Sequence, residues 1–269
     1  MRLGFITINL AGAMAFAFPF FLAGKPSENE TLARSGDAPW LVALFMPVLI
    51  LLAIGDVRGD KGGARTIALL GVLASLAALM RIPLSIGGAN LIFLLPIITG
   101  ATFGPRFGFL LGALAMAASA AITGGFGPWL PFQMWATGWI GAGAGLLSPM
   151  TRMRSSWPAV GALAAYGYVA GFMYGALINL YFWPVTPMDS AIGWSPGLGL
   201  TEMLNHYRAF YLLTSLPYDA LRGVGNAVAI LLVGAPALEL LRRYRNRFAP
   251  VVVRRDPELQ LQTAGAVPG

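Results

Sequence analysis

Forty-five residues without a single Asp, Glu, Lys or Arg separate Arg106 from Arg152: FGFLLGALAMAASAAITGGFGPWLPFQMWATGWIGAGAGLLSPMT (107–151). One helical crossing of the ~30 Å hydrocarbon core of a bilayer takes roughly 20 residues, so this run is long enough for two crossings. Gly and Pro concentrate at its centre, in 124–131, and mark the turn between the two helices. The stretch therefore predicts a membrane-embedded helical hairpin.

The rest of the chain has the same character. Of its 269 residues 57% are hydrophobic and 11% charged, and the mean hydropathy is +0.70. A soluble domain carries about 25% charged residues, so the composition favours an all-α, polytopic membrane protein. The gaps between charged residues delimit eight predicted spans: 4–24, 39–55, 66–80, 89–104, 107–123, 131–149, 158–183 and 218–241.

The basic residues are distributed unevenly over the predicted loops. Thirteen of the 18 Lys and Arg fall on the side that holds both termini and four on the other, with Arg222 inside a span. The positive-inside rule therefore predicts a plasma-membrane protein with both termini in the cytoplasm. Basic residues so placed meet anionic lipid rather than nucleic acid. The polar segment 248–269 is expected to be a disordered cytoplasmic tail.

The chain lacks the residues that most enzyme sites need. It has one histidine, His206, no cysteine, and no Gly-rich loop ending in Lys-Ser or Lys-Thr. We therefore expect no catalytic activity, no metal and no cofactor, and His206 reads as a surface residue. Carriers driven by protons or sodium commonly place a carboxylate near the bilayer midplane, and neither Asp219 nor Glu239 is clearly there. A binding component is favoured, and a stand-alone secondary carrier or channel remains the alternative.

Amide and aromatic side chains accumulate toward the predicted outer side. Trp and Tyr commonly form belts at the membrane interface, which explains about half of them. Amides within apolar spans need hydrogen-bond partners, so they are expected to face a cavity or another helix. The outer segment 184–217 is long enough to fold over such a cavity. The predicted substrate-binding residues are Asn90, Trp129, Gln133, Asn179, Trp183, Tyr218, Asp219 and Asn226.

Asp219 and Arg222 are three residues apart and share one face of the last predicted helix. Charges inside a membrane rarely stay unpaired, so the pattern predicts a mutual ion pair or bonds to neighbouring backbone. Direct contact of Asp219 with a ligand is the alternative. A further pattern is the row of small residues Gly71, Ala74, Ser75 and Ala78, which favours close helix packing.

Three motifs resemble the substrate-binding S components of energy-coupling factor (ECF) vitamin transporters. They are FGPRFGFLLGA (103–113), GFGPWLPFQM (125–134) and SLPYDALRGVGN (215–226). The resemblance covers about residues 66–247, as six helices. It leaves 1–57 as two additional transmembrane helices before a core of 58–247.

The resemblance implies a protein that captures a vitamin-like micronutrient from outside. It also implies docking on a transmembrane coupling subunit that carries two cytoplasmic ATPases. The docking motif of the family, Ala-x-x-x-Ala on the first core helix, falls on Ala74 and Ala78. The hairpin 125–134 is most similar to the cobalamin-type branch, and its aromatic surroundings suit a large planar ligand. Other vitamins and nucleobase-like precursors remain open.

Overall fold

The computed structural model describes residues 2–21, 48, 63–82, 90–152, 156–186, 188 and 191–248. These residues form helices and connecting turns, with no strand among them, which confirms the all-α prediction. Short 3₁₀ turns extend several helices. The α-helices are α1 (Arg2–Ala17), α4 (Gly63–Leu79), α5 (Leu94–Phe103), α6 (Pro105–Thr123), α7 (Leu130–Ala144), α8 (Trp157–Phe182), α9 (Leu200–Thr214) and α10 (Leu216–Phe248).

Seven of the eight predicted spans coincide with these helices, and the span 39–55 lies outside the described residues except for Val48. Within the described part, three helical stretches are long and apolar enough to cross a membrane: Pro105–Thr123, Trp157–Val185 and Leu216–Asn246. The apolar stretches in α1, α4 and the region of α5 are shorter. The helices at these positions therefore follow the hydropathy pattern, but several are shorter than a straight crossing of the bilayer needs.

The outer segment 184–217, for which the charge and hydropathy pattern predicts no span, is partly helical. Its second half folds as α9, which carries Glu202, His206 and Arg208 among its apolar residues. These polar residues lower the hydropathy of the segment, so a search for apolar spans passes over it. The helix is amphipathic, and its buried side faces the rest of the protein.

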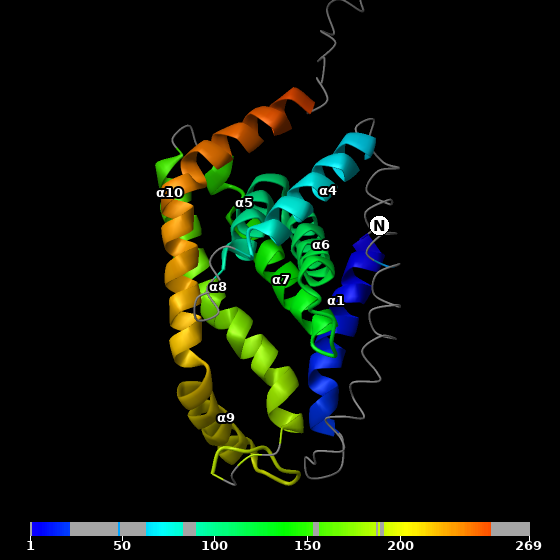
Figure 1. The fold of residues 1–269 in the computed structure, drawn as a ribbon, viewed down its shortest axis with the longest axis vertical. Coiled ribbons are helices and arrows are strands. Elements are labelled where there is room, and N and C mark those ends of the chain that lie inside the picture. The colour runs from blue at the N-terminus through cyan, green and yellow to red at the C-terminus, as the bar shows by residue number, and fades with distance from the viewer. Residues whose placement is uncertain are drawn as a thin grey trace, which may run out of the picture.

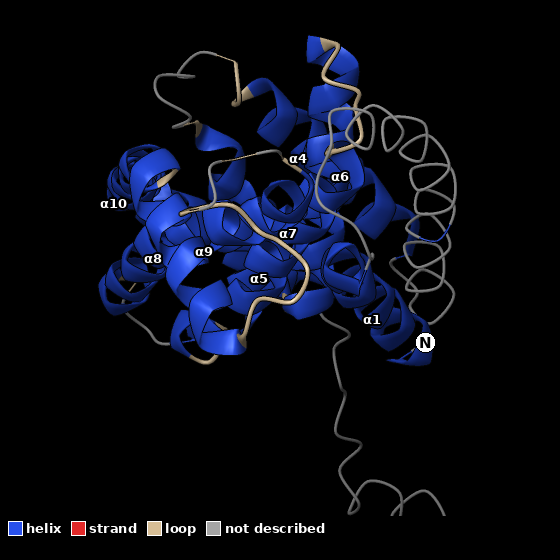
Figure 2. Ribbon diagram, turned by 90° about the horizontal axis from the view of Figure 1, so that it is seen from below, coloured by secondary structure: helices blue, strands red, loops and turns tan. Residues whose placement is uncertain are grey.

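The helices form one elongated bundle with α9 at one end (Figure 1). We call the α9 end the outer end and the opposite end the inner end, after the predicted topology. Helices α8 and α10 run side by side in opposite directions, and the final part of α10 bends across the inner end after Pro236. Viewed from the outer end, α5 and α7 lie between this pair and α1 (Figure 2).

The charge-free hairpin is the pair α6 and α7. Gly124 ends α6 in the left-handed region, at φ 67°, and α7 begins at Leu130. Along the pair the backbones touch: a Cβ on Gly108 would lie 2.2 Å from the carbonyl oxygen of Gly141. The predicted hairpin is thus confirmed, and its glycines allow the close approach that apolar helices need in lipid.

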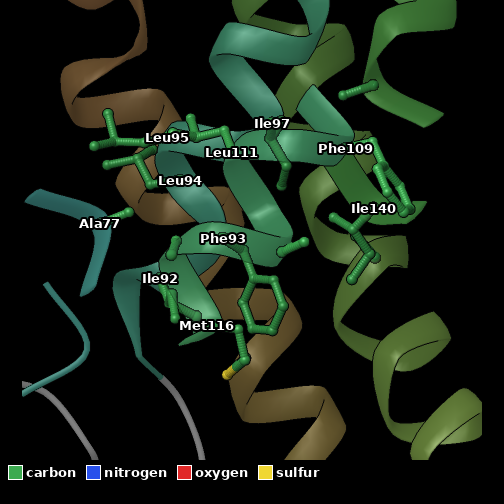
Figure 3. Close-up of a cluster of buried hydrophobic side chains, with 14 of the residues drawn as sticks. Ala77, Ile92, Phe93, Leu94, Leu95, Ile97, Phe109, Leu111, Met116 and Ile140 are labelled. Carbon is green, nitrogen blue, oxygen red and sulfur yellow. The ribbon is translucent and has the colours of Figure 1, made fainter. Parts of the chain in front are cut away.

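A hydrophobic core fills the space between this hairpin and the neighbouring helices. Figure 3 shows Phe93 and Ile97 at its centre with Leu111 of α6, and Ile140 of α7 to one side. All four are almost completely buried. The turn Leu91–Phe93 and the following α5 are therefore internal elements rather than lipid-facing ones.

The contact between α8 and α10 is different, because polar side chains fill it. Gly167, Gly171 and Gly175 recur every four residues and form a stripe along α8. Opposite them, α10 presents Asp219, Arg222 and Asn226. A Cβ on Gly175 would lie 1.7 Å from a carboxylate oxygen of Asp219, and one on Gly171 would lie 2.5 Å from the backbone nitrogen of Gly223. We call this contact the polar seam: Gly167, Gly171, Gly175, Asn179, Ser215, Asp219, Arg222 and Asn226.

The absence of a side chain at position 175 is expected to be essential for stability. Gly175→Leu would force Asp219 and the two helices apart, so the free energy of unfolding should fall by about 1–3 kcal/mol. Gly161→Leu on the same helix is the matched control, because a Cβ there meets nothing within 4 Å. Thermal unfolding of both variants in detergent measures the difference. Equal melting temperatures would show that the seam tolerates a side chain.

Candidate functional site

The polar seam is held by hydrogen bonds at regular steps along α8. Near its inner part, the Asn226 amide donates to the carbonyl oxygen of Gly167 at 3.0 Å. One step further out, Arg222 donates to the carbonyl oxygen of Gly171 at 3.3 Å. At the outer part, the Asn179 amide donates to the Ser215 hydroxyl at 2.7 Å. Each glycine leaves room for a polar group of α10, and the backbone oxygens of Gly167 and Gly171 accept hydrogen bonds from such groups.

Asp219 and Arg222 form the predicted ion pair at the centre of the seam. Both side chains are largely buried. The second carboxylate oxygen of Asp219 accepts a hydrogen bond from the Tyr211 hydroxyl at 2.9 Å. The Arg222 guanidinium lies over the Tyr174 ring, 5.0 Å from its centre. The prediction of a mutual pair with additional backbone bonds is confirmed.

Helix α9 lies over the outer end of the seam and is attached to it by two tyrosines one turn apart. Tyr207 donates its hydroxyl to the carbonyl oxygen of Ala176 on α8 at 2.7 Å, and Tyr211 donates to Asp219 on α10. Burial raises the pKa of both hydroxyls well above the ordinary value, and Asp219 raises each of them further. Both tyrosines therefore keep the protons that they donate at neutral pH.

A group of aromatic side chains lies beside this attachment. Its buried members are Trp183, Trp194 and Phe210, and Tyr207 packs against it. The Trp183 indole donates to the carbonyl oxygen of Ile192 at 2.7 Å, which fixes the loop before α9. We call this group the outer aromatic cluster: Trp183, Trp194, Phe210, Phe20, Met188, Ile192, Met203 and Tyr207.

The structure gathers part of the predicted site and leaves part of it elsewhere. Asn179, Asp219 and Asn226 lie together in the seam, with Trp183 in the adjacent cluster. Tyr218 is 53% exposed although its neighbour Asp219 is buried, because successive residues of a helix point about 100° apart. Asn90 accepts a hydrogen bond from the backbone of Ile92 and so caps the turn before α5.

The two predicted hairpin residues have unequal positions. Trp129 precedes α7, is 37% exposed, and its ring covers Gly127, where a Cβ would lie 2.4 Å from it. Gln133 is half-buried in the first turn of α7. The hairpin thus keeps its shape through a ring-to-glycine contact, while Gln133 faces a more enclosed environment.

Several residues of the site were absent from the predicted list. Tyr174 is buried and packs edge-on against Phe93 while contacting Arg222. Arg81, just beyond the end of α4, reaches inward to the Ser119 hydroxyl at 3.1 Å and the Met116 sulfur at 3.7 Å. The four-residue spacing of Tyr207 and Tyr211 signals a common helix face, but only once the segment is known to be helical.

His206 was expected to be a surface residue. It is half-buried instead, and its Nδ1 atom lies 2.9 Å from the carbonyl oxygen of Gly193. It therefore joins α9 to the loop that precedes it. Among the described residues, no three His, Cys, Asp or Glu side chains gather as a metal site would require.

One buried acceptor in the seam has no partner in the described part of the chain: the side-chain oxygen of Asn226. An unpaired buried amide oxygen costs roughly 1–3 kcal/mol, so such groups usually receive a hydrogen bond from a ligand or water. The seam can therefore accept one more donor. Its charges, by contrast, are already matched within it by Asp219 and Arg222.

The alanines predicted to form the docking face do not lie on the surface. Ala74 is 4% exposed and Ala78 is 0% exposed, because α4 packs this side against the bundle, mainly against α6. The predicted docking contact through them is therefore closed in this structure. The opposite side of α4 is exposed and carries small residues of its own: Ala64, Ala68, Gly71 and Ser75.

Fold and site together define a helical membrane protein in which an amphipathic helix covers buried polar and aromatic side chains. A family model described as ECF transporter, substrate-specific component, matches residues 65–234. This match covers more than half of the chain, and the protein belongs to that family. No curated protein and no solved structure matches it.

The ion pair yields a prediction that tests whether Asp219 and Arg222 stabilise the protein as a pair. Asp219→Asn or Arg222→Gln alone leaves a buried charge unmatched and should destabilise the protein by about 1–3 kcal/mol. The double variant should recover much of the loss, with a coupling energy of about 0.5–3 kcal/mol in thermal unfolding. Tyr218→Phe, on the exposed side of α10, is the control. If the stability lost in the double variant equals the sum of the losses in the two single variants, the two side chains act separately.

Proposed function

We propose that this chain binds a vitamin-like organic micronutrient from the outer side and delivers it as the S component of an ECF importer. Family membership establishes a substrate-specific membrane component. The observation that supports the location of binding is the attachment of α9 through Tyr207 and Tyr211 above the polar seam. Apart from its contacts with the outer aromatic cluster and its loop, α9 is held by these two hydroxyl groups, so it can move without disturbing the larger apolar core between α5, α6 and α7.

The outer aromatic cluster supports a substrate with a flat apolar face. Trp183, Phe210 and Tyr207 present rings to one another near the outer end, at centroid distances of 5.1 to 6.5 Å. Such rings stack on planar ligands, and the free oxygen of Asn226 accepts an amide or hydroxyl proton. Cobalamin or a related large planar ligand remains our preferred substrate, on the resemblance of the hairpin 125–134.

A stand-alone carrier is less well supported. An ion-coupled carrier uses a carboxylate that can bind and release its ion or proton. Asp219 is instead bound to Arg222 and to Tyr211, so both of its oxygens already have partners. We infer that transport by this chain depends on partners that hydrolyse ATP.

The orientation of the protein follows the basic residues. Arg106, Arg242, Arg243 and Arg245 lie at or beside the inner end, where α6 begins and α10 ends (Figure 1). We propose that this end faces the cytoplasm, with the coupling subunit and the two ATPases on that side.

The decisive test of this function is transport in defined vesicles. Protein reconstituted with the coupling subunit and both ATPases should take up its substrate only with ATP, and an ATPase variant unable to hydrolyse ATP should abolish uptake. Mass spectrometry of ligand retained through purification identifies the substrate to be used. Uptake by the isolated chain at the full rate would overturn the proposal in favour of the stand-alone carrier.

Docking is expected on the exposed side of α4. Gly71→Leu combined with Ser75→Leu should prevent co-purification of the coupling subunit, because bulky side chains keep helix backbones apart. A Cβ on Gly71 meets nothing within 4 Å, so the melting temperature of the chain alone should be unchanged. Ala74→Trp combined with Ala78→Trp should instead lower that temperature. Normal complex formation by the Gly71 and Ser75 variant would exclude this face.

Ligand binding is expected to involve the hairpin before α7. Trp129→Ala or Gln133→Ala should weaken binding of the co-purified ligand by about 1–3 kcal/mol, through lost stacking or an unpaired polar group. Titration calorimetry on the purified chain measures the change, with Phe126→Ala as a control on the same turn, since Phe126 is 61% exposed. Unchanged affinity in both variants would make the hairpin a structural turn only.

A further inference from the structure

Helix α1 and the turn Phe18–Phe21 precede the residues that match the family, yet they pack specifically on the bundle. The Trp135 indole donates to the carbonyl oxygen of Ile8 at 3.2 Å, and the Trp139 indole donates to the Asn9 side chain at 2.6 Å. Gly12 lies so close to Trp135 that a Cβ would come within 2.6 Å of its ring nitrogen. Two tryptophans of α7 thus fix the position of α1.

The same helix reaches the outer end through a second set of rings. Phe16 packs against Phe132 at 5.0 Å between ring centroids, and Phe132 stacks on Tyr181 at 4.2 Å. Beyond the end of α1, Phe20 contacts Trp183 at 6.1 Å and Trp194 at 6.2 Å. The N-terminal segment therefore contacts both α7 and the outer aromatic cluster.

The two sides of this segment differ in character. Asn9, Gly12, Phe16 and Phe20 face the protein, while the opposite side carries exposed apolar residues one turn apart: Ile6, Leu10, Met14 and Phe18. Phe18 and Phe20 are two residues apart but only Phe20 touches the cluster. This arrangement provides a matched pair of positions for an experiment.

We propose that residues 2–21 act as a strut that holds the outer aromatic cluster, and with it α9, against the fixed hairpin α6–α7. The cluster joins Trp183, at the end of α8, to Phe210 of α9, and Phe20 is its contact with the strut. Phe20 contacts Trp194 in the loop that precedes α9, so a movement of α9 that carries this loop away has to break the contact or move the strut. Phe20 is thus a positioning residue that restrains the movement of α9. This role does not depend on which substrate the protein binds.

Hydrogen exchange on the full-length chain in detergent tests this role. Phe20→Ala should speed the exchange of amides in 191–214 by about tenfold, while exchange in α6 and α7 stays at the wild-type rate, since local opening is distinct from global unfolding. Phe18→Ala should change neither region, and Phe20→Leu should restore most of the protection. An equal effect of Phe18→Ala and Phe20→Ala, or a uniform rise over all helices, would overturn the proposal.

A second measurement leaves the packed residues unchanged. The chain has no cysteine, so Phe21→Cys and Leu200→Cys introduce a single pair at two exposed positions, one on the strut and one at the start of α9. Spin labels on this pair should give one narrow distance distribution. A broad distribution would show that the strut and α9 move independently, and would overturn the proposal without bearing on transport.

Discussion

The outer half of this protein depends on the polar seam between α8 and α10. In this contact the glycines of α8 leave room for the polar side chains of α10. Apolar packing in lipid lacks the hydrophobic driving force that it has in water, so close approach and hydrogen bonds must hold helices together. Gly167, Gly171 and Gly175 provide the approach, and Asn226, Arg222 and Asp219 provide the bonds. The seam fixes the start of α10, and Asp219 near that start accepts the hydrogen bond from Tyr211 of α9.

This use of polar residues changes how intramembrane amides and charges are interpreted. A buried amide or charge signals a hydrogen-bond partner, which is either a ligand or a neighbouring helix. In the seam the partners lie within the chain: Asn226 bonds to Gly167 of α8, Asp219 accepts from Tyr211 of α9, and Asn179 of α8 bonds to Ser215. The unpaired oxygen of Asn226 is the exception, and it is the one group of the seam that a donor from outside the protein would still satisfy.

The two ends of the bundle are built differently. At the inner end, Arg242 and Arg245 of the bent part of α10 bond to the Ser156 hydroxyl and to the Thr102 carbonyl oxygen, which ties α10 to the neighbouring helices. At the outer end, α9 is held by two tyrosine hydroxyls and by aromatic rings, including Phe20 from before the family match. The Tyr207 bond and the ring contacts are worth about 1 kcal/mol each, and the Tyr211 bond to a carboxylate is worth about 1.5–3 kcal/mol.

The sequence by itself predicted seven spans that the described helices match, the hairpin turn at Gly124 and, as one of its alternatives, the pairing of Asp219 with Arg222. Hydropathy, glycine conformation and three-residue spacing are local properties, so they can be read without knowing the neighbours. The tertiary structure alone decided which side of α4 is buried, because small residues occupy both sides and only the position of α6 distinguishes Ala74 from Gly71. It also decided that Phe20 meets Trp183 and that α9 covers the seam, since burial depends on distant segments of the chain that no local pattern specifies.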